Sequence, residues 1–126
     1  MGDLSPHFSA REFSVDGQPG GRPSPHFLGH LEALRGRIGR PLPIVSWKRS
    51  EAYSRRVVGH RSIWHERGLA VDVPSSLVTV DEAVASGFVG IGVRRGWVVH
   101  VDLRPGAVVI FDDPPRPKLR RETRAA

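Results

Sequence analysis

Three side chains of the types that bind zinc occur on two short segments of the chain. His65 precedes an apolar run over residues 69–73, Asp72 lies inside that run, and His100 lies in a second apolar segment. Two imidazoles and one carboxylate are typical ligands of catalytic zinc sites, in which water takes the fourth position. Because the chain contains no cysteine, any zinc site must use histidine and carboxylate ligands. These residues predict metal-assisted hydrolysis.

The sequence around Asp72 indicates that this carboxylate is not an ordinary surface group. Asp72 stands between two valines, so we expect it to be buried, and a buried carboxylate is costly without a partner. Gly68 lets the backbone turn closely between His65 and the apolar run. If the two segments pair as strands, Asp72 and His100 face one cleft with His65 beside them.

The second segment, residues 97–104, also allows a simpler interpretation. Strand side chains alternate between two faces, and one face of this segment carries the row His100, Asp102 and Arg104. Such a row could be the solvent-exposed face of an ordinary strand. Taken alone, the segment leaves both interpretations open.

Two other catalytic patterns do not fit the sequence. His65 and Glu66 are not followed by the second histidine that a helical H-E-x-x-H zinc site requires. The glycines of residues 87–92 do not form a G-x-G-x-x-G motif between a strand and a helix, so nucleotide binding is not indicated.

The two segments together resemble a known family. Residues 65–72 (HERGLAVD) and 99–102 (VHVD) are similar to the H-x-x-G-x-A-x-D and H-x-D motifs of zinc D-Ala-D-Ala carboxypeptidases, in their small phage and bacterial branch. That family shares a superfamily with lysostaphin-type and hedgehog-type domains. The resemblance extends over residues 4–112 through further short segments, at residues 4–12, 46–49, 57–59, 90–92 and 104–106.

The resemblance implies roles for individual residues. His65, Asp72 and His100 match the zinc ligands, and Arg49 matches the arginine that holds the carboxylate of the substrate. The implied substrate is a peptidoglycan stem peptide, cleaved at D-Ala-D-Ala or a related bond.

The general base is less clearly implied. Larger relatives place an acid three residues before the last histidine, where this chain has Trp97. Asp102 is the first remaining candidate for the catalytic base and Glu66 the second. Asp102 could equally orient a histidine ligand instead.

Two alternative functions remain open at this stage. Trp47, Ile63 and Trp97 replace residues that are usual in the family, which is consistent with a catalytically inactive cell-wall-binding or structural module. The basic tail over residues 114–126 carries five Lys/Arg and one Glu, which allows nucleic-acid binding. The near-neutral charge of residues 1–113 argues against nucleic acid as the specific partner.

The elements that must position these residues are predicted from local signals. The pattern indicates an α+β fold, with short N-terminal helices packed on a small antiparallel sheet that carries the zinc site. Ser9 with Glu12 and Thr79 with Glu82 form capping boxes, and Ser24 followed by Pro25 predicts a helix start. We expect helices over 25–38, 50–58 and 81–86, strands over 44–47, 69–73, 97–103 and 107–111, the last two forming a hairpin, and a loop over 59–64.

Length and charge complete the sequence-based expectations. The 126 residues predict one zinc-peptidase-like domain over 1–113 and a disordered basic tail over 114–126. No apolar run approaches the roughly 20 residues of a membrane span, and no signal peptide is visible. We expect a monomer, synthesised in the cytoplasm and acting at the cell wall after phage-type release.

Overall fold

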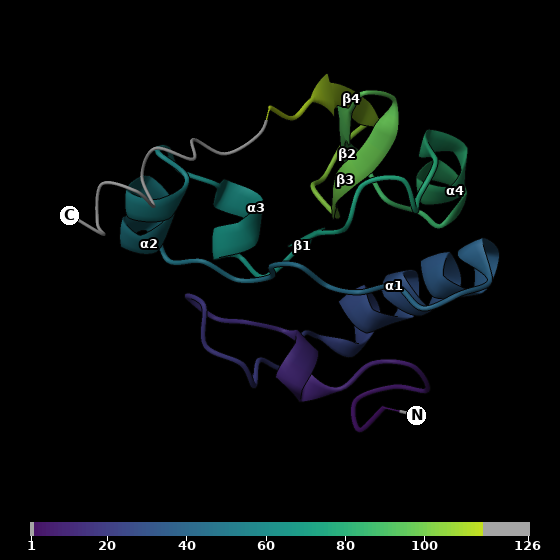
Figure 1. The fold of residues 1–126 in the computed structure, drawn as a ribbon, viewed down its shortest axis with the longest axis horizontal. Helices are drawn as coiled ribbons and strands as arrows, with labels where there is room; N and C mark the ends of the chain where they lie inside the picture. The colour runs from purple at the N-terminus through teal and green to yellow at the C-terminus, as the bar shows by residue number, and fades with distance from the viewer. Residues whose placement is uncertain (1, 115–126) are drawn as a thin grey trace.

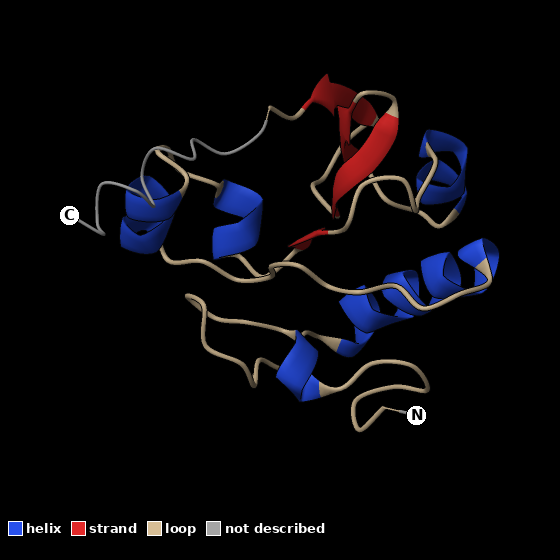
Figure 2. Ribbon diagram, viewed as in Figure 1, coloured by secondary structure: helices blue, strands red, loops and turns tan. Residues whose placement is uncertain are grey.

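The computed structural model describes residues 2–114 as four helices, a 3-10 turn and a four-stranded sheet (Figures 1 and 2). This arrangement confirms the predicted α+β class. In chain order the elements are η1 (Ala10–Glu12), α1 (Pro25–Ile38), α2 (Glu51–Val57), α3 (Ile63–Glu66), β1 (Ala70–Asp72), α4 (Val80–Ala85), β2 (Gly90–Arg94), β3 (Trp97–Asp102) and β4 (Val109–Asp112). The predicted basic tail, apart from Pro114, lies outside the described residues.

The sheet has the strand order β1-β3-β2-β4 and is mixed, not purely antiparallel. Strand β3 pairs antiparallel with both β1 and β2, whereas β4 pairs parallel with β2. The predicted hairpin between the last two strands is therefore wrong. Strands β1 and β2 occupy the two edges of β3, so β4 cannot pair with β3. It pairs instead with the outer edge of β2.

The helix-start signals are confirmed by hydrogen bonds. The Ser24 hydroxyl accepts from the backbone N–H of Phe27 at 3.1 Å, and Gly39 ends α1 in the left-handed conformation with φ of 69°. Both predicted capping boxes, at η1 and at α4, are present. Local side-chain-to-backbone bonds thus fix where these elements begin.

Two local predictions are wrong. Residues 44–47 do not form a strand of the sheet, because Ser46 makes only an isolated bridge to Asp72 and the next bridge, from Lys48, goes to Val15. The predicted loop over 59–64 gives way to helix α3, a single turn that begins at Ile63. This turn carries His65.

The hydrophobic core lies between α1, α4 and the sheet. Its largest fully buried side chains are those of Phe8, Phe13, Phe27, Phe88, Leu31, Leu34 and Ile91, together with valines of the strands. Helices α2 and α3 lie toward the opposite end of β1 from α4 (Figure 1). Strands β1 and β3, which carry Asp72 and His100, thus contribute valines to this packed core. Within residues 2–114, every helix is too short or too polar to cross a membrane.

Candidate metal centre

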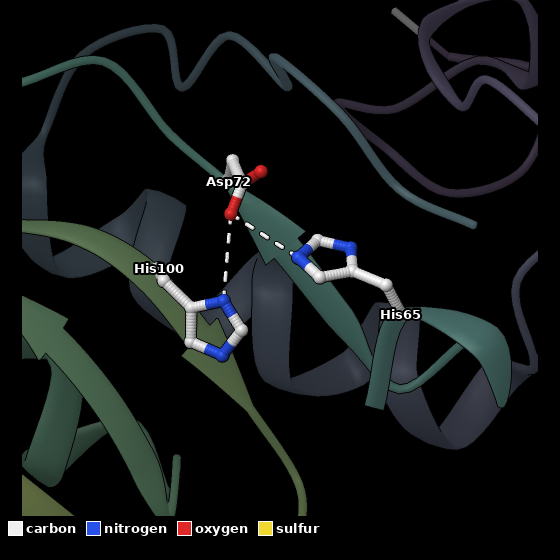
Figure 3. A group of neighbouring side chains, drawn as sticks. All are labelled: His65, Asp72 and His100. Atoms are coloured by element: carbon white, nitrogen blue, oxygen red, sulfur yellow. Dashed lines mark hydrogen bonds and ion pairs between the residues drawn. The ribbon is translucent and has the colours of Figure 1, made fainter. Parts of the chain in front are cut away.

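Strand pairing brings the three predicted metal ligands together (Figure 3). Asp72 and His100 are direct partners in the β1–β3 register, and α3 places His65 beside them. Oδ1 of Asp72 lies 3.2 Å from Nε2 of His65 and 3.4 Å from Nδ1 of His100. One ligand atom from each residue lies within 4.8 Å of the others. A single ion can therefore reach all three.

His100 and Asp102 of the polar row are buried and Arg104 is half-buried, so the alternative of a solvent-exposed face is wrong. His100 is 7% exposed and Asp102 is fully buried. A second strand covers each edge of β3, and the aromatic ring of Phe111 packs against the imidazole of His100. The row consequently faces the interior and needs partners for its polar atoms.

Each histidine has one ring nitrogen held by an acceptor outside the three-residue group. Nδ1 of His65 donates to the backbone carbonyl of Trp47, and Nε2 of His100 donates to Oδ2 of Asp102 at 2.7 Å. A carbonyl and a carboxylate only accept hydrogen bonds, so these assignments place the protons on those two nitrogens. The other nitrogens face Asp72 and carry a lone pair whenever their ring is neutral.

Three groups that can donate an electron pair therefore converge on one point, and Nδ1 of His100 releases its proton when a metal binds there. His, Asp and His are ligands that suit zinc, with a fourth position left for water. Hydrogen bonds that hold the opposite ring nitrogen are the usual support of metal-binding histidines. The residues present thus fit a zinc ion.

The electrostatics of the group agree with this arrangement. Burial lowers the pKa of His65 despite the neighbouring Asp72, which favours the neutral, ligating ring. Burial opposes charge on His100 as well, but its hydrogen bonds to Asp102 and Asp72 raise the pKa of His100 to about 9. The site therefore favours positive charge at the point where the two carboxylates and His100 meet.

Both carboxylates remain ionised. Burial alone would raise the pKa of Asp72, yet its hydrogen bonds to His100 and His65 hold that pKa well below the ordinary value. The pKa of Asp102 is also lowered against the effect of burial, because Arg104 and His100 donate to it. Two anionic groups thus flank the imidazole of His100.

The predicted substrate-binding arginine lies next to the metal group. Arg49 is 5% exposed, and its Nη1 donates to the Ser46 hydroxyl at 2.6 Å and to Oδ2 of Asp72 at 3.2 Å. The backbone of Ser46 pairs with that of Asp72 in turn. A hollow of about 180 Å³ opens beside this arginine, lined by Ser14, Gly17, Val45, Ser46, Arg49 and Tyr53.

The two candidate bases lie outside the three-residue group. Both oxygens of Asp102 are engaged, by His100 and by Arg104. The Glu66 carboxylate accepts from the Arg61 guanidinium at 2.8 Å and 3.2 Å, on the exposed side of α3. Their catalytic roles stay predictions.

Sequence reasoning missed two contributors to this centre. Ser46 binds Arg49 and joins Asp72, and its place at the start of the 46–49 segment that resembles the family was the signal that could have identified it. Arg104 binds Asp102, and its alternation with His100 and Asp102 along one strand face was the signal that could have identified it.

Comparison with known proteins agrees with the geometry. A family model described as Peptidase M15 matches residues 6–102. No curated protein and no solved structure gives a significant match. The matched region contains all three candidate ligands and Arg49, and it covers well over half of the chain. The chain therefore belongs to the Peptidase M15 family.

Proposed function

We propose that this protein is a zinc-dependent peptidase that hydrolyses peptidoglycan stem peptides, as a D-Ala-D-Ala carboxypeptidase or a related endopeptidase. The observation that carries the proposal is the convergence of His65 Nε2, Asp72 Oδ1 and His100 Nδ1 in a chain of a peptidase family. When bound there, zinc supplies a Lewis acid that activates water and polarises a carbonyl.

Arg49 and the adjacent hollow are the proposed substrate subsite. A guanidinium holds a carboxylate through two parallel charge-assisted hydrogen bonds, and Arg49 both lines the hollow and donates to Asp72. Tyr53 and Ser14 also line the hollow. A carboxylate bound by Arg49 would place the neighbouring peptide bond beside the metal ligands.

The proposal is tested by metal analysis combined with cleavage of defined muropeptides. We expect stoichiometric zinc in the purified protein. We also expect either release of a terminal D-residue from the peptides or cleavage of a peptide cross-link. His65→Ala should abolish both zinc retention and cleavage, because it removes one of three ligands. His60→Ala is the matched control, since His60 is exposed and lies outside the metal group.

The result that would overturn the proposal is a protein without zinc, or cleavage that survives His65→Ala. The products decide between the carboxypeptidase and the endopeptidase. A phage lysin would also degrade intact cell walls, so the same variants assayed on whole walls test that role.

A second candidate is a catalytically inactive wall-binding module. It is favoured by one observation: within residues 2–114, the two candidate bases are both engaged by arginines. Zinc binding or wall binding without cleavage of any muropeptide, across pH and metals, would support this candidate over the enzyme.

A further inference from the structure

Arg104 holds the carboxylate of Asp102 through two parallel hydrogen bonds. Its Nε donates to Oδ1 at 2.9 Å and its Nη2 donates to Oδ2 at 2.7 Å. The backbone N–H of Arg104 donates to Oδ1 as well, at 3.0 Å. A paired arrangement of this kind fixes both the position and the orientation of a carboxylate.

The guanidinium of Arg104 itself contacts two aromatic rings. Its central carbon lies 5.5 Å from the ring centre of Trp64 and 5.3 Å from that of Phe111. Contacts of a cation with aromatic faces at such distances are attractive. Phe111 also packs on His100, with 5.5 Å between ring centres. The arginine thus contacts both α3, through Trp64, and β4, through Phe111.

The absence of a side chain at Gly90 leaves room in the sheet for the Asp102–Arg104 pair. Gly90 is the β2 partner of Asp102. A Cβ atom at Gly90 would lie 2.3 Å from both carboxylate oxygens of Asp102 and 2.4 Å from Nε of Arg104. Contacts that short do not occur, so a residue with a side chain at position 90 would displace the pair.

We infer that Arg104 is a positioning residue for the metal site: it fixes Asp102 against Nε2 of His100, so that Nδ1 of His100 stays turned toward Asp72. This inference rests on the proposed metal site. It gives Asp102 the role of orienting a ligand, because both of its oxygens are engaged and the side chain is fully buried. The hydrogen bond from Nε2 selects the ring tautomer that presents Nδ1 as a ligand atom.

The test measures zinc binding to the full-length chain. Metal is removed by dialysis against a chelator, and zinc alone is then titrated in competition with a chromophoric chelator. Arg104→Met should weaken zinc affinity by about 10–100-fold, the usual loss when a group supporting a metal ligand is removed. Arg104→Lys should lie between Arg104→Met and wild type, because one ammonium cannot replace the fork of a guanidinium.

A matched control separates positioning from a change in charge or stacking. Arg67 also stacks on Trp64, at 5.3 Å from its ring centre, but it is exposed. Arg67→Met should therefore retain wild-type zinc affinity. As a second readout, nitrogen NMR of the zinc-loaded protein should show a single His100 form with the proton on Nε2 in wild type and a mixture of ring forms in Arg104→Met.

The outcomes are distinguishable. Wild type that binds no zinc would overturn the proposed function itself. Wild type that binds zinc, with equal affinity and an unchanged His100 tautomer in Arg104→Met, would overturn only the role of Arg104. If Arg104→Met does not fold, wild-type affinity in Arg104→Lys would overturn that role in its place.

Discussion

The two carboxylate oxygens of Asp72 contact different neighbours. Oδ1 faces the two histidines, and Oδ2 accepts from Arg49. The positive charge of Arg49 adds to the hydrogen bonds that hold the pKa of Asp72 low. Arg49 therefore links the metal ligands to the hollow in which we place the substrate.

This placement predicts how Arg49 discriminates among substrates. Wild type should cleave a stem peptide ending in a free carboxylate at least about 10-fold better than its C-terminal amide, since hydrogen bonds to charged groups contribute about 1.5–3 kcal/mol. Arg49→Lys should lose most of this preference, because lysine offers no fork for the carboxylate. The measurement is kcat/KM on the matched acid and amide.

Lys48→Ala is the control for that experiment. Lys48 is the exposed neighbour of Arg49, so removal of its charge should leave the preference for the acid unchanged. Equal rates on acid and amide in wild type would show that Arg49 does not bind a terminal carboxylate.

At the scale of elements, α1 and β2 each contain a glycine, one with open space around it and one closely packed. Gly36 is exposed within α1, with no atom within 4 Å of an added Cβ. Gly36→Ala should stabilise the protein by about 1 kcal/mol, because alanine favours the helix over glycine. Gly90→Ala should destabilise it by about 1–3 kcal/mol through overpacking against Asp102 and Arg104.

Chemical denaturation of the two variants checks this pair of expectations. The free energy of unfolding should move in opposite directions for the same added methyl group. A neutral or stabilising Gly90→Ala would mean that the sheet accommodates a side chain beside Asp102.

Elements with local signals could be predicted from the sequence, and those fixed by distant contacts could not. Ser24 and Thr79 cap their own helices, so α1 and α4 were predicted nearly to the residue. Helix α3 is a single turn whose preceding residue, Ser62, makes no side-chain cap, and it was missed. The parallel pairing of β4 with β2 depends on which sheet edge remains free, which no local pattern records.

The site shows the same division. Alternation along two strands predicted that Asp72 and His100 would face each other, and the observed register pairs them directly. The supports of the two histidines were harder to predict. The carbonyl of Trp47 is a backbone group that carries no sequence signal, and it accepts from His65 between the isolated bridges of Ser46 and Lys48.

At the scale of the whole molecule, Glu32 ties the N-terminal turn to α1. Its carboxylate accepts from the Ser5 hydroxyl and from the backbone N–H of His7, each at 2.7 Å, and its other oxygen contacts the His7 ring. Burial would raise the pKa of Glu32, but these hydrogen bonds lower it below its ordinary value of 4.5. The ionised form therefore stabilises the folded state.

This lowered pKa predicts an acid-dependent loss of stability. A depressed pKa in the folded state gives stability that is present above pH 4.5 and is lost as pH falls through the folded pKa. Glu32→Gln should lower the free energy of unfolding by about 1–2 kcal/mol at pH 7, and the difference from wild type should shrink as the pH falls below 4.5. Urea unfolding between pH 7 and pH 3 measures it.

Glu51→Gln is the comparison for Glu32→Gln. Glu51 forms exposed ion pairs with Arg55 and Arg61, and such pairs contribute roughly 0–1 kcal/mol. Its effect at pH 7 should therefore be the smaller one. A pH-independent difference between Glu32→Gln and wild type would show that the ionisation of Glu32 does not stabilise the fold.

The pairing of Asp72 with His100 joins positions 28 residues apart in the chain, and the protein has no cysteine. An ion bound by both residues would act as a cross-link between β1 and β3, much as a disulfide does in other small domains. Because the unfolded chain does not hold the three ligands together, the binding free energy becomes folding free energy. A zinc ion bound there would thus also stabilise the folded domain. Removal of zinc should therefore lower the melting temperature as well as the activity.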